Sequence, residues 1–128
     1  MQEVLDVVEK ARADGYENFI GITISSAMSS TFNAVRSALI EYSEENPTAK
    51  TYSFDSKNIS IGSGVFAIWA ASELNDGKSF EEVTEGLERK KYDIHLAFYM
   101  DTLEYLKKGG RITPSVAIVG KLLNLRPI

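Results

Sequence analysis

The chain of 128 residues contains no cysteine and only one histidine. The absence of cysteine excludes disulfides, thiolate metal sites and a cysteine nucleophile, and it fits a reducing cytoplasm, where we expect the protein to act. One histidine without any cysteine offers no familiar set of zinc ligands. We therefore expect neither a metal nor a cofactor.

Long hydrophobic runs and an excess of positive charge are also absent. The longest apolar run covers residues 65–71, whereas a membrane helix needs about 20 residues. No basic segment followed by an apolar one opens the chain, so we expect neither a signal peptide nor membrane insertion. The net charge of −4 provides no basic field for phosphate backbones, which argues against a nucleic-acid partner.

The residues that are present are typical of a soluble globular domain, with 44% hydrophobic and 25% charged residues. Apolar residues at helical spacing predict helices, and short β-branched runs predict strands. The predicted helices cover residues 2–13, 32–44, 65–74, 80–91, a segment ending at 109–110, and 115–123. The predicted strands cover 18–24, 51–54 and 93–100. Strands separated by helices favour an α/β fold with three αβα layers and a mostly parallel sheet.

Local signals mark several helix ends. Ser79 and Glu82 form a predicted capping box, and Asp101 and Glu104 form a second one with an aspartate cap. We interpret residues 1–128 as a single α/β domain and as a fragment of a longer, two-domain protein. Residues 124–128 then mark the start of the second domain.

Three polar clusters follow the three predicted strands. They are residues 25–31 (SSAMSST), residues 55–60 (DSKNIS), and Asp101 with Thr102. In a parallel sheet, ligands bind beyond the carboxyl ends of the strands. The clusters therefore predict a binding site at one edge, lined by residues that include Ser25, Ser26 and Asp101.

The run SSAMSST also opens a predicted helix, and two interpretations remain open for it. Ser29 or Ser30 caps the helix while the other hydroxyls bond to the backbone. Alternatively, the free amides of the helix start, together with the small hydroxyls, hold a carboxylate or phosphate.

Catalytic motifs are lacking. His95 lies inside a predicted strand, away from its end, and no G-x-S-x-G elbow occurs. The Gly62-Ser-Gly64 segment lacks the third glycine of a dinucleotide fingerprint. We interpret Lys57 as a solvated surface charge and leave Arg111, after two glycines, as a candidate anion ligand. We expect no enzyme activity.

Four stretches together resemble the DegV family in order and spacing: ITISSAMSSTFNAV, FDSKNISIGSG, DTLEYLKKGGRI and LLNLRPI. The resemblance covers nearly the whole chain. It implies a bacterial fatty-acid-binding protein with two α/β domains and a buried acyl chain. Several such proteins carry the acyl group for a two-component fatty acid kinase, in which a separate ATP-binding protein phosphorylates the carboxylate.

The resemblance also implies roles for individual residues. Ser29 matches the serine whose hydroxyl holds the fatty acid carboxylate, assisted by the amide of Ser30, and Arg111 matches an arginine near the head group. A motif lining the same edge matches Asp55, Ser56, Ser60 and Gly62. This chain reads Ser29-Ser30-Thr31 where the family pattern is Ser-Gly-Thr.

Two alternatives to a fatty acid carrier remain at this stage. One is a phosphosugar-binding or isomerase-type α/β domain, which also uses hydroxyl-rich loops at helix starts. It needs a base, and the sequence indicates no second catalytic group to act with the candidates His95, Asp101 and Glu104. The other is an interaction domain whose serines only cap helices. We also expect self-association if a truncated sheet exposes an apolar face.

Overall fold

The computed structural model describes residues 1–97 and 102–112. It divides into two compact units, Met1–Leu96 and Ala97–Ile128, and each is described by itself. Unit 1 contains α1 (Gln2–Ala13), β1 (Phe19–Thr23), α2 (Thr31–Glu45), β2 (Thr51–Asp55), α3 (Ile61–Asn75) and α4 (Phe80–Lys90). The described part of unit 2 contains α5 (Glu104–Lys108).

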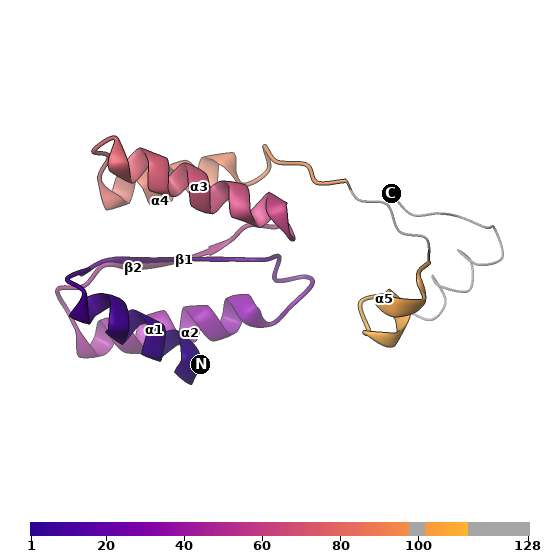
Figure 1. The fold of residues 1–128 in the computed structure, drawn as a ribbon, viewed down its shortest axis with the longest axis horizontal. Helices are drawn as coiled ribbons and strands as arrows, with labels where there is room; N and C mark the ends of the chain where they lie inside the picture. The colour runs from indigo at the N-terminus through magenta and orange to yellow at the C-terminus, as the bar shows by residue number, and fades with distance from the viewer. Residues whose placement is uncertain (98–101, 113–128) are drawn as a thin grey trace. The chain divides into compact units, whose positions relative to one another are not determined.

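Unit 1 has the three layers that the sequence predicts. β1 and β2 pair in parallel, with Phe19 opposite Thr51 and Thr23 opposite Asp55. Helices α1 and α2 cover one face of this sheet, and α3 and α4 cover the other (Figure 1). The α/β class and the parallel pairing are therefore confirmed.

A separate hydrophobic cluster fills the space on each side of the sheet, because successive strand residues point to opposite faces. The cluster under α3 and α4 is built on Phe54, Phe66 and Leu87, and Ile20 and Ile22 pack against it. The cluster under α1 and α2 is built on residues that include Val8, Leu39 and Tyr42. Both faces of β1 are apolar for this reason.

The helix starts and ends follow local signals closely. At the start of α4, the Ser79 hydroxyl accepts from the Glu82 amide, and the Glu82 carboxylate accepts from the Ser79 amide, so the first predicted capping box is confirmed. α5 ends in a Schellman arrangement, in which the Arg111 amide donates to the Leu106 carbonyl at 2.9 Å and Gly110 has a φ of +72°.

Two sequence expectations about the elements need correction. α3 begins at Ile61, four residues before the predicted start. Residues 93–97, the described part of the predicted third strand, are not in a strand. α5 begins at Glu104, whose amide donates to the Thr102 hydroxyl at 3.2 Å. The predicted capping box with Asp101 and the predicted helix 115–123 lie outside the described residues.

The direction of α3 and α4 explains where residue 94 lies. α3 starts beside the loop after β2, at the carboxyl edge of the sheet. α4 runs back to the same edge, where the Asn58 side-chain amide donates to the Ile94 carbonyl at 3.1 Å. Residues 94–97 therefore begin at the carboxyl edge of the sheet, whereas a parallel strand has to begin at the opposite edge.

Candidate functional site

The loops that follow β1 and β2 meet at the carboxyl edge of the sheet. The Ser25 amide donates to the Asn58 carbonyl at 2.7 Å, and the Ser56 amide donates to the Thr23 carbonyl at 3.3 Å. The parallel register, which sets Thr23 opposite Asp55, brings these loops together. Two of the three predicted polar clusters thus share one edge.

Asp55 connects the two loops. One carboxylate oxygen accepts from the amides of Ser26 and Lys57, each at 3.1 Å, and the other accepts from the Lys57 ammonium at 2.7 Å. Burial on its own raises the pKa of Asp55, but the hydrogen bonds from Lys57 and Ser26 outweigh it and lower the pKa to about 2. Asp55 is therefore ionised and nearly buried, and its hydrogen bonds link the two loops.

Lys57 is exposed, as the sequence suggested, but it is not an isolated charge. Its ammonium pairs with Asp55 and also donates to the Ser26 hydroxyl at 3.2 Å. Its backbone has a φ of +54°, which residues other than glycine rarely adopt. The hydrogen bond to Asp55 raises the pKa of Lys57 further above its ordinary value.

The serine loop, residues 25–31, leaves several donors available. The Ser29 hydroxyl accepts from the Thr31 amide at 3.2 Å and contacts the Thr31 hydroxyl at 2.8 Å. Ser30 directly precedes α2, but its side chain makes no cap bond. Among the described residues, the hydrogen bonds include none from the amides of Ser30, Phe32 or Asn33. Capping by Ser29 thus satisfies one amide of the helix start and leaves others free for an anion.

The other predicted lining residues have mainly structural contacts in this conformation. Ser56 is fully buried, and its hydroxyl accepts from the Asn58 amide at 3.2 Å. Ser60 directly precedes α3 with a φ of +50°, and its carbonyl accepts from the Ser63 amide at 3.2 Å. A Cβ on Gly62 would lie 2.7 Å from the Asn58 side-chain oxygen, so only glycine fits there without displacing Asn58.

The remaining candidates lie elsewhere. Arg111 belongs to unit 2, where its guanidinium donates to the Gly109 carbonyl. Asp101 is outside the described residues. His95 is exposed and not in a strand, which corrects the sequence expectation, and with Lys57 and Lys91 it lines a pocket of about 270 Å³.

Sequence reasoning missed a second polar group beside this edge. Tyr52 donates to Glu88, and the Lys91 ammonium lies 2.5 Å from the other Glu88 oxygen. Burial and the Glu88 carboxylate raise the pKa of Tyr52. Burial on its own raises the pKa of Glu88, but the hydrogen bonds from Lys91 and Tyr52 outweigh it and lower this pKa. Tyr52 lies 36 residues from Glu88 in sequence, so no local pattern could reveal its part in the group.

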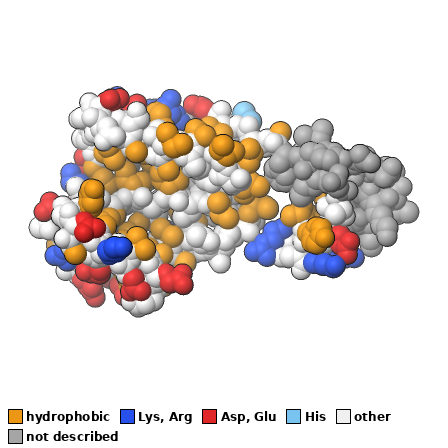
Figure 2. All heavy atoms as spheres, in the orientation of Figure 1, with side chains coloured by type: hydrophobic (Ala, Val, Ile, Leu, Met, Phe, Trp, Pro, Cys, Tyr) orange, Lys and Arg blue, Asp and Glu red, His pale blue; other side chains and the backbone are white. Residues whose placement is uncertain are grey.

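Two apolar grooves, each of about 580 Å³, flank β1. One lies against α1 and α2 and includes Val7 and Leu39, and the other lies against α3 and includes Ala70 and Leu74. Ile20, Ile22 and Tyr16 contribute to both. Figure 2 shows hydrophobic side chains gathered across the middle of this face of unit 1, with charged side chains towards its margins.

Within residues 1–97 and 102–112, no three histidine, cysteine, aspartate or glutamate side chains gather closely enough to hold a metal ion. None of the helices in that part of the chain is both long enough and apolar enough to cross a membrane.

The fold and this edge define an α/β domain with an anion-compatible loop and apolar grooves. Comparison with known proteins identifies the family: the model of the DegV family, described as "Uncharacterised protein, DegV family", matches residues 1–128. The chain belongs to the DegV family.

Relatives and solved structures agree with this assignment. A DegV domain-containing protein of Clostridium acetobutylicum is 38% identical over 128 residues, which are all of this chain and 44% of that protein. A DegV family protein of Thermus thermophilus, whose structure concerns fatty acid binding, is 31% identical with a TM-score of 0.81, over 98% of this chain and 43% of that one. A DegV family protein of Eubacterium eligens loaded with heptadecanoic acid is 25% identical with a TM-score of 0.76, over 94% and 49%. The chain spans less than half the length of these proteins.

Proposed function

We propose that this chain binds a long-chain fatty acid and holds its carboxylate at the serine loop. The observation that carries the proposal is the set of donors at the start of α2, where the Ser30 amide has no partner among the described residues and Ser29 presents a hydroxyl. Its support from outside the chain is that DegV proteins of Thermus thermophilus and Eubacterium eligens bind fatty acids.

The proposed contacts follow from ordinary hydrogen-bond chemistry. A carboxylate accepts from the Ser29 hydroxyl and the Ser30 amide, and the positive end of the α2 dipole stabilises its charge. Arg111 is proposed as a cationic contact on the strength of its match to the family motif. The residues proposed to shape or line the site are Ser25, Ser26, Asp55, Ser56, Ser60, Gly62 and Asp101.

The acyl chain needs apolar surface next to the head group. β1 lines both apolar grooves and leads directly into the serine loop. We infer that one of the grooves receives the first part of the chain. Because this protein spans less than half of its relatives' length, we expect the 128-residue chain to hold fatty acid weakly, and a sub-micromolar dissociation constant would contradict that expectation.

The carboxylate is further proposed to be presented to a separate ATP-dependent kinase for phosphorylation. Ser30 and Thr31 are exposed, which leaves this end of the site accessible to a partner. The protein itself is then a carrier without catalytic activity. The cytoplasmic location and the single-domain organisation of residues 1–128 stay predictions, as does self-association, which sedimentation of the purified chain would test.

The first experiment is native mass spectrometry of the purified chain, followed by organic extraction of any bound molecule. A co-purified fatty acid supports the proposal, and an extracted sugar phosphate supports the isomerase-type alternative instead. If the chain is empty, added dodecanoic acid is titrated by calorimetry, and an absence of binding there refutes the proposal.

A matched pair of variants then locates the carboxylate. Ser29→Ala removes a hydrogen bond to a charged group, and we expect the dissociation constant to rise about tenfold or more. Ser43→Ala makes the same change near the other end of α2, where the hydroxyl donates to the Ile40 carbonyl at 2.8 Å. Equal effects of both variants would count against the serine loop as the site.

A further inference from the structure

The Lys57 ammonium, at the carboxyl edge of the sheet, has more N–H donors than it has partners among the described residues. An ammonium group has three N–H donors. One contacts Asp55 at 2.7 Å and one contacts the Ser26 hydroxyl at 3.2 Å, and no partner for a third occurs among the described residues. The side chain is 40% exposed, so this donor is accessible to a ligand.

Ser26 takes part in the same group of hydrogen bonds as Lys57 and Asp55. Its hydroxyl accepts the bond from Lys57, and its amide donates to Asp55 at 3.1 Å. The Ser26 hydroxyl also hydrogen-bonds to the Asp55 side chain, so its own hydrogen is engaged there. Ser26 and Asp55 together hold the Lys57 ammonium in place, and Lys57 presents the charged donor.

The pair belongs to the same loop as the proposed carboxylate position. The amides of Met28 and Ser29 both donate to the Ser25 carbonyl, at 2.9 and 3.1 Å, so the chain turns tightly between Ser25 and Ser29. Ser26, which holds the Lys57 ammonium, lies within this turn, three residues before Ser29.

Asp55 does not cancel the charge that a ligand meets. Its carboxylate is only 7% exposed and already accepts from two amides and from the ammonium, whereas Lys57 is partly exposed. The negative end of the ion pair faces the protein and the positive end faces solvent. A carboxylate at the serine loop therefore meets the cation first.

We propose that Lys57, held by Asp55 and the Ser26 hydroxyl, is a specificity-determining residue that selects ionised head groups at the serine loop. This inference rests on the proposed function and adds a cation from unit 1 to the site. It assigns Asp55 the role of a positioning residue, because Asp55 fixes both the Lys57 side chain and the Ser26 amide.

The test measures the ratio of two affinities. Dodecanoic acid and dodecan-1-ol are titrated at pH 8 into the unaltered chain and into Lys57→Met. The acid has the charge that Lys57 recognises and the alcohol does not, so we expect the variant to lose about tenfold in affinity for the acid and little for the alcohol. A purely structural loss would weaken both ligands equally.

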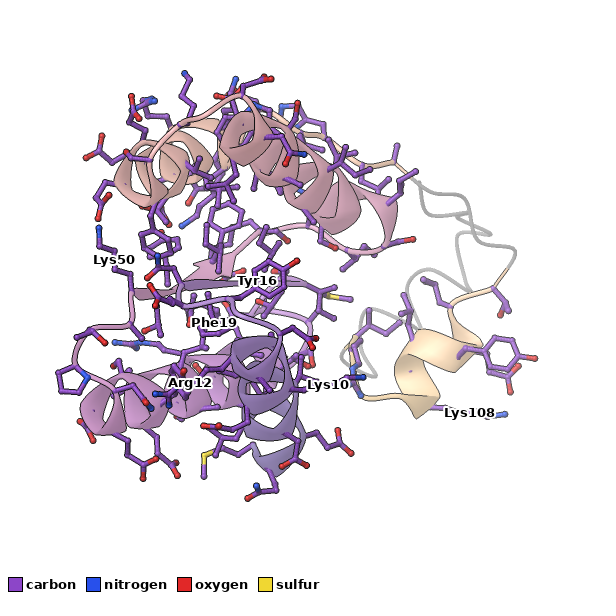
Figure 3. All side chains as sticks on the ribbon, turned by 60° about the vertical axis from the view of Figure 1, so that its left-hand side comes forward. Lys10, Arg12, Tyr16, Phe19, Lys50 and Lys108 are labelled. Atoms are coloured by element: carbon purple, nitrogen blue, oxygen red, sulfur yellow. The ribbon has the colours of Figure 1, made fainter. Side chains whose placement is uncertain are left out.

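Two further variants complete the design. Lys57→Arg keeps the charge and should restore most of the preference for the acid. Lys50→Met is the matched control: Lys50 reaches from the start of β2 towards α4 (Figure 3), where its ammonium lies 2.6 Å from Glu81, at the opposite end of the strand. We expect the ratio of its affinities for the acid and the alcohol to equal that of the unaltered chain.

The outcomes separate this inference from the function on which it rests. If the unaltered chain binds neither ligand, the proposed function fails and the assignment of Lys57 fails with it. If the unaltered chain prefers the acid and Lys57→Met keeps that preference, only the assignment of Lys57 is overturned. A loss of preference in Lys57→Met, restored in Lys57→Arg and absent in Lys50→Met, supports it.

Discussion

Replacing Asp55 by asparagine should make the stability of unit 1 less dependent on pH. Asp55 is 6% exposed, and its carboxylate holds the serine loop through the Ser26 amide. Asparagine has nearly the same shape but no charge, so Asp55→Asn weakens the pairing with Lys57 while leaving a similar volume filled. The expected effect is electrostatic and depends on whether the aspartate is ionised.

The size of the effect follows from the pKa of Asp55, which falls from an ordinary 3.8 to about 2 in the folded protein. At about 1.4 kcal/mol for each pH unit, this corresponds to about 2 kcal/mol of unfolding free energy. Because the folded pKa is the lower one, the stabilisation is fully present above about pH 5. It is lost as the pH falls through 3.8 towards 2.

Urea unfolding followed by fluorescence measures this directly, because Trp69 is the only tryptophan and lies in α3. We expect Asp55→Asn to be less stable than the unaltered chain by about 2 kcal/mol at pH 6, and the difference to shrink strongly at pH 2.5. Asp14→Asn, a change at an exposed aspartate, serves as the control and should show no such convergence. A difference that is the same at both pH values would refute the electrostatic reasoning.

Three other substitutions test the fold, with Val7→Ala as a control. Leu87 is fully buried, so Leu87→Ala should cost about 2–5 kcal/mol in urea unfolding, whereas Val7→Ala at a 67% exposed position should change stability by less than about 0.5 kcal/mol. A Cβ on Gly86 would lie 2.4 Å from the Trp69 ring, so Gly86→Ala should destabilise by about 1–3 kcal/mol and shift the tryptophan emission; an unchanged spectrum and midpoint would show that the helices separate easily. Ser79→Ala removes the confirmed cap of α4 and should lower the thermal midpoint by an amount equivalent to about 1 kcal/mol, with full stability counting against the capping box.

Features that depend on neighbouring residues could be predicted from the sequence. The bounds of α1, the capping box of α4 and the end of α5 at two glycines all follow the prediction closely, because each is set by contacts within a few residues. The meeting of the first two polar clusters was also predictable, since it follows from parallel pairing alone.

The tertiary structure decided what local patterns could not. Residues 61–64 contain two glycines and read as loop, yet they form the first turn of α3, where a Cβ on Gly62 would lie 2.7 Å from the Asn58 side-chain oxygen. Residues 94–97 have the alternation of a strand, but a strand requires a neighbour to pair with, and α4 delivers this segment to the carboxyl edge instead.

The α/β class, the family and the serine-rich start of α2 could all be predicted from the amino-acid sequence. That Lys57, paired with the nearby Asp55, also bonds to Ser26 across 31 residues of chain became visible only in three dimensions. The physical reason is that charge pairing depends on distance in space, and the distance between these loops is set by the register of two strands rather than by any nearby sequence signal.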